Sequence, residues 1–122
     1  MTLTSGPVQD DLTVIVEKTL RSLRISGHLI GLQYLVAAVS KAVKDPLYPL
    51  YVTKKIYPEI AFQFSSSDKA VERAIRTAIR SGWELGNSAQ LEEIAGYPLK
   101  KFPTNAMFID LVATHIRYDL HK

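Results

Sequence analysis

The sequence predicts a compact all-α domain of about six helices. Three observations favour this class: apolar residues recur at three- and four-residue intervals, no segment shows sustained strand alternation, and proline, glycine and serine separate the periodic segments. With 122 residues, 47% of them hydrophobic, the chain is long enough for one domain with a core of its own. We expect a tail or linker over residues 1–7 and the helical domain over residues 8–122.

The first two predicted helices supply much of the core. One opens at Pro7, is closed by Ser26-Gly27 and carries a single apolar side: Val8, Leu12, Ile15, Val16, Leu20 and Leu23. The other, from His28 to about Val43, is apolar at almost every position. We therefore expect this second helix to be buried on most sides and to lie at the centre of the core. Asp45-Pro46 ends it.

Shorter elements follow the second helix. Residues 47–56 predict a short helix or turn because prolines punctuate the segment. A brief helix then runs from Pro58, which suits a first helical position, to Phe64. Three tyrosines flank this unit, and one of them is a candidate contact for a sugar or phosphate: Tyr48, Tyr51 and Tyr57.

Three further helices are predicted from capping residues. One of the three serines at 65–67 caps a long helix from about 68 to 85, and Gly86-Asn87 supplies a left-handed exit residue. Ser88 is a candidate cap for a short helix that ends at Gly96. The last helix starts at Thr104 or Asn105 and carries its apolar residues on one side: Phe108, Leu111, Val112 and Ile116.

The helix from about 68 to 85 has a basic strip and an apolar face. Each helical residue advances by about 100°, so four basic residues project from one strip: Lys69, Arg73, Arg76 and Arg80. Taken alone, this pattern favours an ordinary solvated helix, since lysine and arginine commonly point outward. Arginine is nevertheless well suited to guanine edges and phosphates, and Glu72 beside the strip is suited to the amino group of cytosine.

The residues before this helix match a helix-turn-helix. Within residues 57–76, Ile60, Phe64 and Val71 take the apolar positions that pack two helices together, and Ala61 allows close approach. Ser65 stands in the turn where glycine is commoner. Lys54 and Lys55 lie just upstream and are candidate phosphate contacts.

A longer series of residues resembles the C-terminal DNA-binding effector domain of the stage zero sporulation response regulator of endospore-forming bacteria. The resemblance runs from about residue 20 to 120 and is carried by Tyr57-Pro58-Glu59-Ile60-Ala61, Val71-Glu72-Arg73-Ala74-Ile75-Arg76, Ala78-Ile79, Trp83, Gly86-Asn87, Gly96-Tyr97, Pro103-Thr104-Asn105 and Phe108-Ile109. It implies that the helix from about 68 reads the major groove of a promoter element, with two copies bound in tandem. By position, Glu72, Arg73 and Arg76 match the family's recognition residues.

The resemblance also implies a second surface. The segment from Gly86 to Ala95 matches the region through which the family is thought to touch the sigma subunit of RNA polymerase, so Gly86, Gln90, Glu92 and Ala95 are candidate contacts. Binding would then serve activation as well as repression.

This chain departs from the family pattern at several positions. The family usually has an arginine at Ala70, a histidine at Thr77 and a basic residue at Ile30, and Ala95 replaces a bulkier residue. The family protein also has an N-terminal receiver domain with a phosphorylated aspartate, and these 122 residues supply no such α/β unit. Either an excised effector domain or a natural receiver-less relative fits the sequence.

The sequence shows no pattern typical of a metal site, a cofactor site, an enzyme active site or a membrane span. There is no cysteine, the three histidines lack the close spacing of a zinc motif, and no glycine-rich phosphate loop is present, so we predict no metal, no cofactor and no enzyme. The longest apolar run, 25–39, is interrupted and falls short of the roughly 18 to 20 residues of a membrane span. A cysteine-free chain suits a reducing cytoplasm, where we expect the protein to be located.

The sequence as a whole predicts a DNA-binding transcription regulator. In this hypothesis Arg73 and Arg76 contact base edges, Glu72 tunes them, and phosphates are contacted by Lys54, Lys55, Lys69 and Arg80. The net charge of +3 and a pI near 9.2 are compatible with such a partner. The alternative is a receiver-less protein-interaction module that binds polymerase or another regulator with little DNA specificity.

Overall fold

The computed structural model describes residues 7–121, and the predicted tail at 1–7 falls outside this range except for Pro7. Between these limits the chain folds into six α-helices with no strand, which confirms the predicted all-α class. The helices are α1 (Pro7–Ser22), α2 (Ile30–Lys44), α3 (Tyr57–Gln63), α4 (Asp68–Glu84), α5 (Ser88–Ala95) and α6 (Asn105–Leu120). Between α2 and α3 lie a 3₁₀ turn, η1 (Tyr48–Tyr51), and a π-helical turn, η2 (Val52–Ile56).

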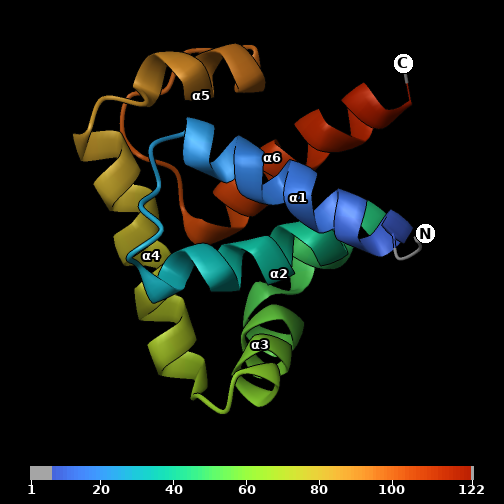
Figure 1. The fold of residues 1–122 in the computed structure, drawn as a ribbon. Helices are drawn as coiled ribbons and strands as arrows, with labels where there is room; N and C mark the ends of the chain where they lie inside the picture. Colours follow the sequence, from blue (N-terminus) through green and yellow to red (C-terminus); the bar gives the residue numbers. More distant parts are fainter. Residues whose placement is uncertain (1–6, 122) are drawn as a thin grey trace.

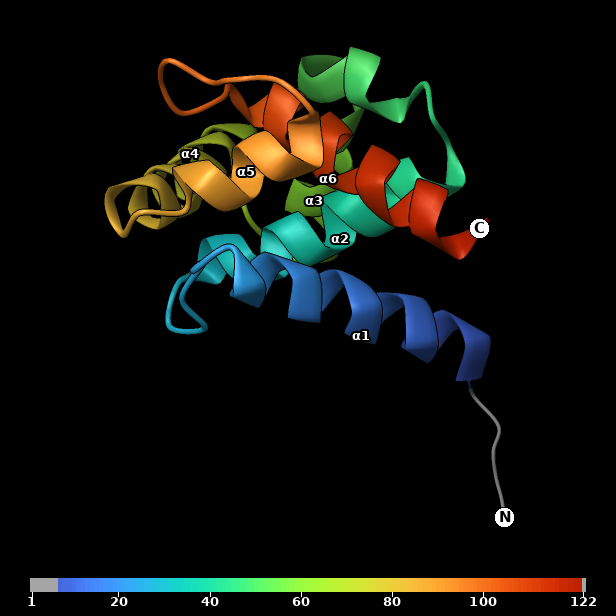
Figure 2. The ribbon, with the colours of Figure 1, turned by 90° about the horizontal axis from the view of Figure 1, so that it is seen from above.

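Helix α2 lies at the centre of the fold, as its continuous apolar composition predicted. It packs against α1, α4 and α6, and its long buried face includes Leu35, Ala38 and Val39. Viewed from above, α2 lies between α1 and α6 (Figure 2). Helix α4 runs along one edge of the molecule with the start of α2 against it (Figure 1). This arrangement leaves one side of α4 facing solvent.

The first helix ends earlier than its glycine suggested. Helix α1 stops at Ser22, and Arg24 takes the left-handed conformation (φ +64°), whereas the sequence placed the end at Ser26-Gly27. The early turn lets Leu23 and Ile25, both almost fully buried, enter the core on either side of Arg24. Burial of two apolar side chains outweighs the modest cost of the left-handed residue. Ile15, predicted on the apolar side, is 37% exposed at the edge of that side.

The cap of α5 also differs from the sequence prediction. Gly86 is left-handed (φ +94°), as predicted, but the residue that precedes the helix is Asn87 and not Ser88. The Asn87 side chain is fully buried, and its Nδ2 donates to the carbonyl oxygen of Leu23 at 2.8 Å. Asn87 therefore ties the end of α4 to the turn after α1.

An ion pair anchors η1 and α3 to α2. Glu59 Oε1 accepts from Lys41 Nζ at 2.8 Å and from the Tyr48 hydroxyl at 2.7 Å. The hydrogen bond from Lys41, followed by that from Tyr48, holds the pKa of Glu59 below its usual value of 4.5. Burial, together with the neighbouring Glu59 carboxylate, raises the pKa of the Tyr48 hydroxyl.

Stability should depend on pH through Glu59. Because its pKa is lowered on folding, the carboxylate stabilises the fold above its unfolded pKa, and that contribution is lost as pH falls through the folded value. We expect Glu59→Gln to be less stable than the parent at pH 7 by less than about 1 kcal/mol, since both ion-pair partners are partly exposed. Urea unfolding should show a smaller difference in the free energy of unfolding between parent and variant at pH 3 than at pH 7. A difference that is the same at both pH values would contradict this role.

Candidate nucleic-acid interface

Helices α3 and α4 form the predicted helix-turn-helix. Ile60, Ala61 and Val71 are buried at the α3–α4 contact, and Phe64 packs edge-on against the ring of Tyr34 with centroids 5.2 Å apart. Ser65 occupies the turn with φ +54°, the conformation for which glycine is favoured. The backbone therefore keeps the usual turn although the usual residue is missing.

Replacing Ser65 by glycine should stabilise the domain. A left-handed residue with a Cβ costs roughly 1 kcal/mol or more that glycine avoids, while glycine loses more entropy on folding, so we expect a net gain of about 0.5 kcal/mol. Ser66→Gly is the matched control, because Ser66 is not left-handed and only the entropy loss remains. Urea unfolding should rank the parent between the two variants, and the reverse order would refute the argument.

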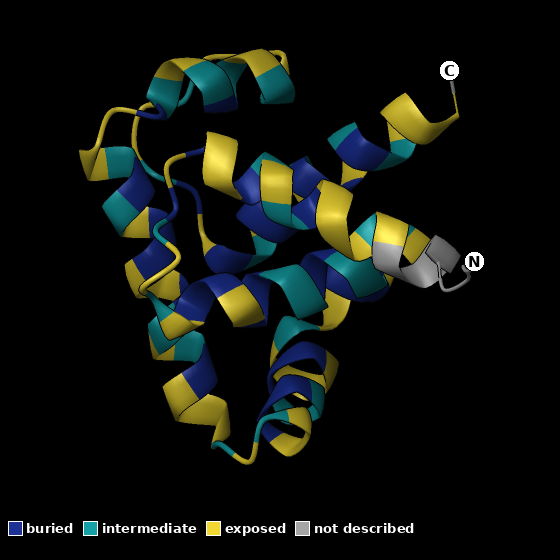
Figure 3. Ribbon diagram, in the orientation of Figure 1, coloured by how far each residue is buried: buried dark blue, intermediate teal, exposed yellow. Residues whose placement is uncertain are grey.

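Helix α4 presents its apolar face inward and its basic strip outward. Ser67 caps the helix by accepting from the Ala70 N–H at 3.1 Å, and Asp68 places a negative charge in the first turn. The predicted packing residues are all buried: Val71, Ile75, Ala78, Ile79 and Gly82. The predicted strip residues are all exposed: Lys69, Arg73, Arg76 and Arg80. The alternation of buried and exposed sides along α4 is visible in Figure 3.

The cations of the strip differ in how they are held. Arg76 Nη2 lies 2.9 Å from Glu72 Oε2, an ion pair one helical turn apart. The guanidinium of Arg80 stacks over the ring of Phe102 at 5.3 Å. The side chains of Arg73 and Lys69 make no hydrogen bond or ion pair with the side chains described at residues 11–121 or with the backbone of this range. The strip thus combines oriented guanidinium groups with one that is available for an anion or a base edge.

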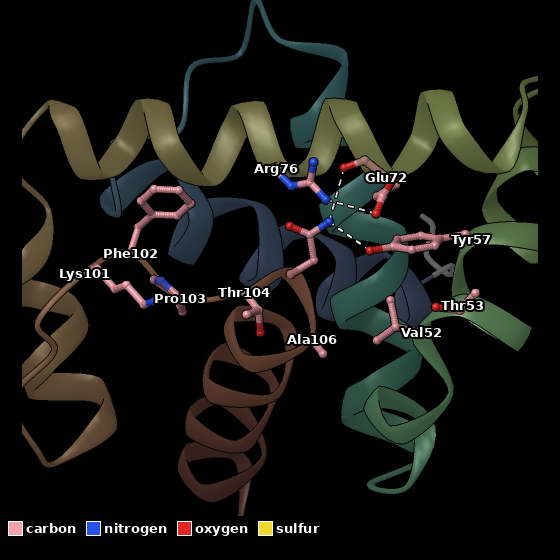
Figure 4. A pocket seen from close by; sticks show the side chains of 11 residues that line it. Val52, Thr53, Tyr57, Glu72, Arg76, Lys101, Phe102, Pro103, Thr104 and Ala106 are labelled. Atoms are coloured by element: carbon pink, nitrogen blue, oxygen red, sulfur yellow. Dashed lines mark hydrogen bonds and ion pairs between the residues drawn. The ribbon is translucent and has the colours of Figure 1, made fainter.

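A hollow of about 470 Å³ opens beside the middle of the strip, at Arg76 (Figure 4). Glu72 and Arg76 line it from α4, Thr53 from η2 and Lys101 from the loop before α6. Asn105, at the first turn of α6, donates from Nδ2 to the Tyr57 hydroxyl at 2.9 Å and to the carbonyl oxygen of Glu72 at 3.2 Å. This amide joins α3, α4 and α6 at one point and helps to fix the position of α4 relative to the other two helices.

Sequence reasoning missed the structural role of this amide. The sequence marks Asn105 as a possible first residue of the last helix and as part of the family resemblance, but no local pattern pairs it with Tyr57, which is 48 residues away. Burial raises the pKa of the Tyr57 hydroxyl, and its hydrogen bond to Asn105 opposes that rise. The hydroxyls of Tyr57 and Tyr48 are both engaged inside the fold, so of the three flanking tyrosines Tyr51 alone is exposed.

A comparison with protein families assigns this architecture. The family model described as "Sporulation initiation factor Spo0A C terminal" matches residues 16–116. The chain belongs to this family. The members of this family are DNA-binding domains of sporulation transcription factors, and the family is not an enzyme family. The helical fold and the outward basic strip of α4 accord with this assignment.

Other predicted site residues of this Spo0A-type domain lie at two further places. Lys54 and Lys55 are exposed on η2, and Lys55 Nζ lies 5.2 Å from the ring centroid of Tyr51. Of the four residues predicted to contact sigma, Gly86 is exposed and three are partly buried: Gln90, Glu92 and Ala95. Glu92 Oε2 accepts from the Leu99 N–H at 2.7 Å, so this carboxylate also holds the following loop.

Among the side chains described, those of residues 11–121, no cluster of three or more metal-ligating groups occurs. Within the same range, no helix combines the length and the hydropathy required to cross a bilayer.

Proposed function

We propose that this domain regulates transcription in the cytoplasm by inserting α4 into the major groove of a promoter element. The observation that carries the proposal is the outward strip of α4, which is held in place by a fully buried opposite face. A helix supported in this way by α2, α3 and α6 has the geometry of a recognition helix. The family assignment supplies the DNA-binding class.

Each strip residue has a proposed role. Arg73 and Arg76 contact base edges, because a guanidinium group donates two parallel bonds to guanine O6 and N7. Glu72 orients Arg76 through their 2.9 Å ion pair and is itself available to cytosine N4. Four other cations contact phosphates: Lys54, Lys55, Lys69 and Arg80.

Selection of bound duplexes from a random pool tests the proposal. We expect a short enriched element, with two copies of the domain bound in tandem at elements about one helical turn apart. A pool that shows no enrichment after repeated rounds, while binding remains salt-sensitive, would indicate phosphate contacts without base reading and would refute the proposal.

We further propose that α5 contacts the sigma subunit of RNA polymerase. Among the side chains of α5, Leu91 alone is fully buried, and the exposed apolar residues Leu85 and Tyr97 flank the helix at its two ends. Such residues at the rim of a projecting helix suit a protein partner.

Replacing Gln90 on α5 by arginine should separate the two activities. Gln90 is on α5 and not on α4, so we expect duplex affinity to stay within about twofold, whereas activation in a purified transcription assay should fall severalfold if sigma binds here. Gln33→Arg is the matched control, because it makes the same substitution, with the same added charge, at an exposed position of α2. Equal activation by the parent and the Gln90 variant would argue against this surface.

A further inference from the structure

A second hollow, of about 290 Å³, lies along the other flank of α4. Ile30 and Gly31 at the start of α2 form one wall, and Ala70, Ala74 and Thr77 of α4 form the other. Arg73 stands at its rim. Apart from Arg73 and the Thr77 hydroxyl, the side chains here are apolar, and Ile30 is 48% exposed to solvent. An apolar hollow thus adjoins the basic strip.

The order of side chains around α4 places this hollow on the reading face. At about 100° per residue, Arg73 points almost directly away from the buried face. Glu72 and Arg76 lie on one flank of Arg73, whereas Ala70 and Thr77 lie on the other. The face of α4 proposed to contact DNA therefore has a charged side, with Glu72 and Arg76, and an apolar side, with Ala70 and Thr77, and Arg73 lies between them.

The major groove presents one apolar group that an apolar surface of this kind is suited to contact. Base edges there present hydrogen-bond donors and acceptors, except for the 5-methyl group of thymine, which alanine and threonine methyl groups contact. We propose that the hollow receives the 5-methyl group of a thymine adjacent to the base pair read by Arg73. The inference rests on the proposed function, because it assigns a specificity determinant to the same helix.

Ile30 gives the hollow a wall that lies outside the reading helix. Gly31 has no side chain, and this lets the start of α2 lie directly on the backbone of α4 beside Ala74. That contact brings the Ile30 side chain alongside Ala70 and Thr77. A methyl group entering the hollow is enclosed from two elements and not merely touched by one, which increases the apolar area removed from water.

Deoxyuridine substitution tests this inference. In a duplex selected by the domain, each thymine is replaced in turn by deoxyuridine, which removes a single methyl group. At one thymine next to the pair that is sensitive to Arg73→Ala, we expect affinity to fall about fourfold, equivalent to about 0.8 kcal/mol for a buried methyl group. The double variant Ile30→Ala, Thr77→Ser should bind the thymine and deoxyuridine duplexes equally.

Matched measurements separate the possible outcomes. Leu47→Ala, a change at a residue that is 60% exposed outside the hollow, should retain the fourfold difference, and circular dichroism should confirm that each variant is folded. Equal binding of all deoxyuridine duplexes by the parent, with Arg73→Ala still losing discrimination, overturns the methyl pocket alone. A fourfold difference that persists in the double variant also overturns it. Equal losses on all sequences for Arg73→Ala overturn the proposed function as well.

Discussion

Replacing Gly31 by alanine is expected to destabilise the domain by about 1 to 3 kcal/mol. A Cβ at this position would overlap the carbonyl oxygen of Ala74 and lie 2.8 Å from the Cβ of Ala78. Both atoms belong to α4, whose backbone cannot rotate away as a long side chain can. The start of α2 would have to move away from α4, so the new methyl group would displace the helix that carries the basic strip.

Gly27→Ala is the matched control for this prediction. The nearest atoms to its Cβ would be those at the end of the Arg21 side chain, from 2.8 Å, and that flexible group can move. We expect a change within about 0.5 kcal/mol. Urea unfolding of both variants checks the difference, and similar losses for Gly27→Ala and Gly31→Ala would show that close approach to α4 is not what Gly31 provides.

Replacing Arg73 by alanine is expected to lower affinity for a selected duplex by about 1 to 3 kcal/mol and to relax the preference at one base pair. The side chain is exposed and lies at the centre of the outward face of α4, so its loss should leave the fold unchanged. Fluorescence anisotropy with the selected duplex and with four single-pair substitutions measures both effects.

Lys55→Ala provides the contrast for Arg73→Ala. Lys55 is a proposed phosphate contact on η2, so its loss should weaken cognate and random duplexes alike and reduce the slope of log affinity against log salt by about 0.9. If Arg73→Ala gives the same uniform loss, Arg73 contacts the backbone and does not read a base.

Much of the fold and of the strip could be predicted from local patterns. The inward and outward faces of α4 follow from one helical period, and residue type indicates a serine cap within 65–67 and a helix start at Thr104 or Asn105, where the structure selects Ser67 and Thr104 as the caps. Each of these features depends on residues within one or two turns of one another. Short-range periodicity therefore sufficed to place the four strip cations on one exposed face.

The features that escaped prediction are long-range. Arg24 adopts a left-handed conformation because its two neighbours, Leu23 and Ile25, are buried. Asn87, and not Ser88, occupies the N-cap position of α5, and its side chain donates to Leu23 instead of capping the helix. The Asn105 amide and the contact of Gly31 with Ala74 likewise join residues that are more than forty positions apart. Tertiary packing decides such contacts, and a single helical pattern contains no information about them.

Because Glu72 forms an ion pair with Arg76, the two central arginines, Arg73 and Arg76, should lose different amounts of side-chain entropy on binding a duplex. The ion pair already restricts the rotamers of Arg76, whereas in the proposed complex Arg73 would become ordered only on binding, at a cost of about 0.5 to 1.5 kcal/mol for such a side chain. Cooling should consequently favour the Arg73 contact more than the Arg76 contact, so the two base pairs would differ in how strongly temperature affects their recognition.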